Sequence, residues 1–140
     1  MTARPTGARR THHILVADDE PHIGRIIKMK LEQGPFHVSL AEDGEEALAQ
    51  IRAAPDLAVV VLDLMMPGIG GMDVLEQLRG EEATKDLPTI VLTAAGEEEQ
   101  QLRARTLGAN EFLTKPFSPK KLYALIAQIV GEDPQPAGGE

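Results

Sequence analysis

Six apolar residues stand in a row from Leu57 to Leu62 and are followed at once by Asp63. The run contains three consecutive valines, which favour extended backbone, and it shows no alternation with polar residues. A continuous apolar run is typical of a parallel strand that helices cover on both faces, and six residues are too few to cross a membrane. The pattern therefore predicts a buried strand with a carboxylate at its tip.

Four further segments have strand patterns. A short apolar run ends at Ala17, residues 36–41 alternate between apolar and polar positions, and the run TIVLTA follows Pro88 and ends at Thr93. A last short strand, EFLT, leads into Lys115 and Pro116. Together with the Leu57–Asp63 segment, these patterns predict five strands.

Helical patterns fill the intervals between and after the strands. Apolar residues recur at helical spacing after Pro21, around residues 47–51 and over Met72–Arg79. Residues 97–107 are mostly polar, with Leu102 and Leu107 as their large apolar residues, so this helix should be the least firmly held. The helix after Ser118 carries an unbroken apolar stripe: Leu122, Leu125, Ile126 and Ile129.

The five strands alternate with five helices, which predicts an α/β fold. With right-handed crossovers the expected architecture is a single doubly wound parallel sheet of flavodoxin-like strand order 2-1-3-4-5. We expect one domain over residues 12–130, flanked by flexible tails at 1–11 and 131–140. No segment suggests a DNA-binding or catalytic effector module, so the chain is expected to act as a stand-alone unit; a piece of a longer protein would show the same pattern.

Composition narrows the class of protein. The 140 residues suit one domain, and the absence of cysteine removes disulfide and thiolate metal sites and favours a cytoplasmic location. A net charge of -8 and a pI near 5.0 argue against a broad nucleic-acid or anionic-membrane surface. We therefore expect no DNA binding by this chain and no membrane association.

Polar residues, which are unusual in an apolar core, are found at the ends of four strands. Asp18 and Asp19 follow the first strand, Asp63 ends the third, Thr93 ends the fourth and Lys115 follows the fifth. In the order 2-1-3-4-5 these four strands are neighbours, so the groups should meet at one edge of the sheet.

These residue types suit phosphoryl transfer. Clustered carboxylates repel one another unless a hard divalent cation such as Mg²⁺ lies among them, and a carboxylate can also accept a phosphoryl group. Lys115 could neutralise charge on that group while Thr93 hydrogen-bonds one of its oxygens. The pattern predicts a phosphorylation site on Asp63.

The segments ILVADDE, VVVLDLMMPGIGGMDVL, IVLTAA and FLTKPF, in this order, resemble the receiver domain of two-component response regulators, over about residues 12–130. The resemblance implies that Asp63 takes phosphate from a sensor histidine kinase or a histidine phosphotransfer protein. It also implies that Asp18, Asp19, Asp63 and the Met65 carbonyl bind Mg²⁺, and that Thr93 and Lys115 engage the phosphoryl group. Further implied features are an aromatic switch at Phe112 and a cis peptide bond at Pro116.

The implied activity is a signalling switch rather than an enzyme. Phosphorylation would draw Thr93 inward, Phe112 would follow, and the surface around the helix at 97–107 and the last strand would change for a downstream protein target. The chain would catalyse only its own phosphorylation and dephosphorylation.

Two other classes stay open on the residues alone. A phosphatase working through an aspartyl-phosphate usually has a second aspartate two residues after the nucleophile, and that position is Met65 here. A phosphate-independent interaction module of the same fold is disfavoured by the complete set of acidic residues. Taken singly, Asp18 or Asp19 could be a helix N-cap, Thr93 a strand-end hydroxyl, Lys115 a solvated charge and Phe112 a core residue.

Overall fold

The computed structural model describes residues 11–134, so most of the predicted tails at 1–11 and 131–140 lies outside the described residues. The strands are β1 His12–Ala17, β2 Phe36–Ala41, β3 Leu57–Asp63, β4 Thr89–Ala94 and β5 Glu111–Lys115. The helices are α1 Pro21–Leu31, α2 Gly44–Ala53, α3 Gly71–Gly80, α4 Glu98–Thr106 and α5 Pro119–Val130.

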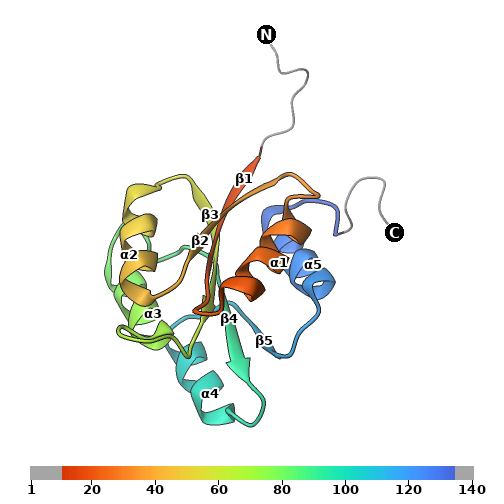
Figure 1. Ribbon diagram of the computed structural model, residues 1–140. Coiled ribbons are helices and arrows are strands. Elements are labelled where there is room, and N and C mark those ends of the chain that lie inside the picture. The colour runs from red at the N-terminus through yellow and green to blue at the C-terminus, as the bar shows by residue number, and fades with distance from the viewer. Residues whose placement is uncertain (1–10, 135–140) are drawn as a thin grey trace.

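The five strands form one parallel sheet in the order β2-β1-β3-β4-β5, which confirms the predicted doubly wound fold. Helices α1 and α5 cover one face of the sheet, and α2, α3 and α4 cover the other (Figure 1). The central strand β3 is buried on both faces, as its continuous apolar run predicts.

Each face of the sheet has its own apolar core. On one face, Leu122 and Ile126 from the stripe of α5 pack with Val59 and Val61 of β3. On the other face, side chains of α2 and α3 pack against Val60 and Leu62, the alternate residues of β3. The side-chain oxygen of Ser118 accepts a hydrogen bond from the Lys121 amide and caps α5 at its N-terminus.

The strand register brings the polar strand tips to the same level. Ala17 pairs with Leu62, so Asp18 is level with Asp63 on the neighbouring strand. Asp63 pairs with Leu92 and is therefore one position before Thr93, while Lys115 pairs with Ala94. All of these groups lie at the carboxyl edge of the sheet, where ligands collect in open α/β folds.

Helix α4 is held differently from the other four helices. Its single buried residue is Ala104, whereas Leu102, one of its large apolar residues in the sequence, is 64% exposed. Its C-terminal end is held by Arg79 of α3, whose Nη2 donates to the Gly108 carbonyl (3.0 Å) and to Asn110 Oδ1 (3.3 Å). The helix therefore depends on polar contacts more than on apolar burial.

Candidate functional site

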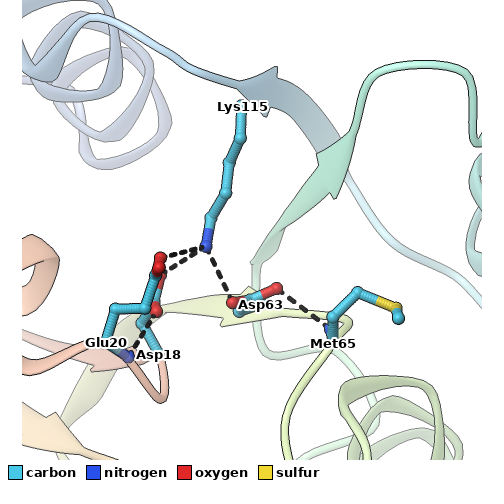
Figure 2. A network of polar contacts seen from close by, with 5 residues as sticks. All are labelled: Asp18, Glu20, Asp63, Met65 and Lys115. Carbon is cyan, nitrogen blue, oxygen red and sulfur yellow. Dashed lines mark hydrogen bonds and ion pairs between the residues drawn. The ribbon is translucent and has the colours of Figure 1, made fainter.

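Asp63 lies at the carboxyl end of β3 with both carboxylate oxygens engaged. The side chain is buried, Oδ1 accepts a hydrogen bond from the Met65 amide (3.0 Å), and Oδ2 accepts one from Lys115 Nζ (2.9 Å). Figure 2 shows the Met65 side chain pointing away from the cluster, so this residue contributes its backbone to the site. The carboxylate is thus fixed in orientation from two sides.

Asp18 lies beside Asp63 and is also buried. Its Oδ1 accepts the Glu20 amide (2.9 Å), while its Oδ2 is a buried oxygen without a hydrogen bond, although the Lys115 ammonium lies 3.0 Å away as an ion pair. Glu20 itself occupies the N-cap position of α1, and no side chain caps that helix. A structural role as the N-cap of α1 is therefore excluded for Asp18 and Asp19.

Lys115 is the cation shared by these carboxylates (Figure 2). Its Nζ also lies 3.4 Å from Glu20 Oε1. Burial lowers the pKa of Lys115, but the hydrogen bond to Asp63 and the negative charges of Asp63 and Asp18 outweigh that effect, so the pKa lies well above its ordinary value. The ammonium stays charged at any physiological pH.

The charge at Asp18 is only partly compensated. Burial raises the pKa of the Asp18 carboxyl, the Glu20 amide and Lys115 lower it, and the negative charge of Asp63 raises it further, with a net upward shift. One ammonium faces three carboxylates here, those of Asp18, Glu20 and Asp63, and cannot satisfy all of them. The negative charge of the carboxylates exceeds the positive charge of Lys115, so a further cation would be stabilised here.

The residues present fit a hard divalent cation. Oxygen atoms of Asp18, Asp19 and Asp63 lie within 4.8 Å of one another, and Asp19 is exposed to solvent. The buried Asp18 Oδ2 lacks a hydrogen bond, so it is available as a ligand. Carboxylates with solvent access are the donor set of Mg²⁺ and Ca²⁺ sites.

Thr93, near the carboxyl end of β4, and Phe112, near the start of β5, contact α4 rather than the carboxylates. Thr93 is buried, and its Oγ1 accepts a hydrogen bond from Gln101 Nε2 (3.2 Å). Phe112 of β5 is partly buried, and the Arg105 guanidinium lies 4.9 Å from the centroid of its ring. The Lys115–Pro116 peptide bond is cis.

Comparison with known proteins decides the family. The family described as the response regulator receiver domain matches residues 14–127, nearly the whole of the described chain. The chain belongs to this family. It is the receiver domain of a two-component response regulator, and the resemblance of its four motifs is confirmed.

Individual relatives agree with this assignment. The phosphate regulon transcriptional regulatory protein PhoB of Escherichia coli is 42% identical over 118 residues, which are 84% of this chain and 51% of PhoB. The transcriptional regulatory protein ResD of Bacillus subtilis is 43% identical over 118 residues, or 84% of this chain and 47% of ResD. The chain thus spans about half the length of these relatives.

Solved receiver structures have the same fold. The non-phosphorylated HemR receiver domain of Leptospira biflexa superposes with a TM-score of 0.78 at 33% identity, covering 88% of this chain and 97% of that one. The chemotaxis response regulator CheY4 of Vibrio cholerae gives a TM-score of 0.79 at 28% identity, with coverages of 85% and 98%. Within residues 11–134, no helix of this receiver domain has the length and apolar character needed to span a bilayer.

The sequence did not single out three residues that shape the site of this receiver domain. Glu20 adds a third carboxylate around Lys115, Gln101 binds the Thr93 hydroxyl, and Gly71 packs against the backbone of Asp63. Gly71 is the first residue of α3, and a Cβ at this position would meet the Asp63 carbonyl oxygen and lie 2.8 Å from the Leu64 α-carbon. The close approach of α3 to the end of β3 thus requires glycine at this position.

The Gly71→Ala variant is expected to be destabilised by about 1–3 kcal/mol, because the added methyl group meets backbone atoms that cannot rotate away. Chemical denaturation monitored by circular dichroism measures this loss. Gly80→Ala in the same helix is the control, since a Cβ there has no neighbour within 4 Å and the substitution should be neutral or slightly stabilising. Equal stabilities of the two variants would show that Gly71 is not required at this contact.

Proposed function

We propose that Asp63 is the phosphoacceptor of this receiver domain and that a sensor histidine kinase or a histidine phosphotransfer protein is the donor. An Asp63 oxygen would attack the phosphorus of the donor's phosphohistidine, the P–N bond would break, and an acyl phosphate would remain on Asp63. The observation that carries this proposal is the placement of Asp63, a buried strand-end carboxylate bound to Lys115 among further carboxylates.

Other residues of the site have roles that follow from their chemistry. Lys115 holds one Asp63 oxygen and would neutralise charge on the transferred group, and Thr93 would donate its hydroxyl to a phosphoryl oxygen. Asp18, Asp19, Asp63 and the Met65 carbonyl would hold Mg²⁺, which supplies charge neutralisation for the transfer. The receiver unit would span residues 12–130 and act catalytically only on its own phosphorylation and dephosphorylation.

Phosphorylation would then act as a switch between two states in equilibrium. The acyl phosphate adds about two negative charges beside Lys115, which favours a state with Thr93 drawn toward the phosphoryl group and Phe112 turned inward. Helix α4 and strand β5 carry the contacts of Thr93 and Phe112, so their surface would change for a downstream protein target.

Intact mass spectrometry after incubation with acetyl phosphate tests the proposal. The expected result is a gain of one phosphoryl group in the presence of Mg²⁺, no gain in EDTA, and assignment of the group to Asp63 after borohydride reduction and peptide mapping. Steady turnover of a phosphoester would instead indicate a phosphatase. A complete lack of uptake would favour a phosphate-independent interaction module.

The raised pKa of Asp18 predicts a pH dependence of Mg²⁺ binding. The proton and the cation compete for this carboxyl, so affinity should fall as the pH drops through a folded-state pKa above the ordinary 3.8. Titrations of Mg²⁺ by calorimetry between about pH 4.5 and 7.5 measure the effect. Asp18→Asn should bind more weakly and with a flatter pH profile, and an unchanged profile in that variant would assign the dependence to another group.

A further inference from the structure

Helix α4 contacts both residues that the proposed switch moves. Gln101 donates a hydrogen bond to Thr93 Oγ1 (3.2 Å), and the guanidinium of Arg105 lies 4.9 Å from the ring centroid of Phe112. Positions 101 and 105 are one helical turn apart, so the two side chains lie on one face of α4. That face also carries Ala104, the single buried residue of the helix.

These two contacts matter because α4 has few apolar contacts with the sheet: Ala104 is buried, and the C-cap residue Leu107 packs against the core. Leu102 points to solvent and is 64% exposed, and the bonds from Arg79 reach only the residues that follow the C-terminal end of the helix. The N-terminal half is therefore attached to the strand tips mainly through Gln101. A change at Thr93 is transmitted directly to the helix.

We propose that Gln101 and Arg105 are positioning residues that hold Thr93 and Phe112 in the unphosphorylated arrangement, so that α4 itself opposes the switch. The inference rests on the proposed function, because it identifies the contacts of Gln101 and Arg105 that must break when Asp63 is phosphorylated. Thr93 Oγ1 is bonded to Gln101 rather than to Asp63 or Lys115, so its movement toward the phosphoryl group breaks that bond. An inward turn of Phe112 removes its ring from Arg105.

The expected size of the effect follows from the strength of each contact. A neutral hydrogen bond shifts an equilibrium by about two- to tenfold, and an exposed cation–π contact by about two- to fivefold. While the switched state is a minor population, a ligand specific for that state gains affinity by the same factor when the restraint is removed. Beryllofluoride with Mg²⁺, a mimic of the acyl phosphate, is such a ligand.

The test compares beryllofluoride affinity in the full chain with Mg²⁺ present, measured by calorimetry. Gln101→Leu is expected to bind about two- to tenfold more tightly than the wild-type protein. Gln100→Leu is the matched control, because it makes the same substitution one position away and leaves the bond from Gln101 to Thr93 Oγ1 in place, and it should bind as the wild type does. Equal affinities of the two variants, or weaker binding by Gln101→Leu, would overturn the role of Gln101.

A double-mutant cycle separates positioning from general loosening of α4. In a Thr93→Val background the hydroxyl acceptor is absent, so Gln101→Leu should produce no further change in affinity. If the substitution acted only by weakening the helix, it would shift affinity equally in both backgrounds, which would contradict the proposal. Gln101→Ala provides a second substitution should the leucine variant fold poorly.

The same affinity measurement tests the second positioning residue with Arg105→Leu. Arg103→Leu, on a different side of the helix, is its control. We expect Arg105→Leu to tighten beryllofluoride binding by about two- to fivefold and to have no effect in a Phe112→Leu background. If the wild-type protein takes neither phosphate nor beryllofluoride, the proposed function fails and this inference with it. If the wild type binds and the Gln101 and Arg105 variants match their controls, only this inference is overturned.

Discussion

The Asp63→Asn variant is expected to take no phosphoryl group from acetyl phosphate under conditions in which the wild-type protein takes one. An amide oxygen is far less nucleophilic than a carboxylate and cannot form the acyl phosphate. The carboxamide of the variant retains an oxygen that can accept the Met65 amide, as Asp63 Oδ1 does, so the fold of the loop after β3 should persist. Intact mass measures uptake, and circular dichroism checks that the variant is folded.

Asp73→Asn is the matched control for this experiment. Asp73 lies on the exposed side of α3, outside the cluster of carboxylates, and its replacement makes the same chemical change. It should leave uptake at the wild-type level. If Asp63→Asn still took one phosphoryl group, and uptake were lost only when another aspartate was replaced as well, that other aspartate would be the acceptor.

The Lys115→Met variant is expected to lose stability and reactivity together. It leaves the buried carboxylates of Asp18 and Asp63 without their shared cation, which should cost about 1–3 kcal/mol, less than a fully buried pair because Lys115 is partly exposed. It also removes a donor to the transferred group, so uptake should slow by about a hundredfold. Denaturation curves and time-resolved mass spectra measure the two effects.

The pH dependence of the stability loss in Lys115→Met shows whether the loss comes from uncompensated carboxylate charge or from lost packing. Without Lys115 the pKa of Asp18, already raised by burial, should rise further. An acid with a raised folded-state pKa destabilises the protein as the pH rises through that pKa, so the loss should be larger at about pH 8 than at about pH 5. Added Mg²⁺ should restore part of the stability that Lys115→Met loses. Lys120→Met, an exposed control, should show neither effect, and a pH-independent loss in Lys115→Met would indicate lost packing instead.

Much of the fold could be predicted because apolar patterns set it. The unbroken run of β3 indicated burial on two faces, and the strand order placed Asp18 level with Asp63, as the register shows. Two strands end slightly later than predicted: β4 continues to Ala94 and β5 to Lys115, because these two residues pair one position beyond Thr93 and Thr114. Such shifts leave the strand tips in place.

The contacts of α4 could not be predicted from its sequence. A helix without an apolar stripe gives no signal for which side faces the sheet, and Leu102, one of its large apolar residues, faces solvent. Gln100 and Gln101 are chemically identical, so only the rotation of the helix decides which one meets Thr93. Gly71 stands among several glycines, and its requirement comes from a tertiary contact with the Asp63 carbonyl.

The weak apolar burial of α4 has a consequence for local stability. Opening this helix exposes Ala104 and few other apolar atoms, so its free energy of opening should lie well below that of global unfolding. Its amide hydrogens should therefore exchange with solvent before those of α5, whose stripe is buried against β3. A partner that binds a rearranged or unwound α4 would then need to supply little energy beyond that of its own contacts.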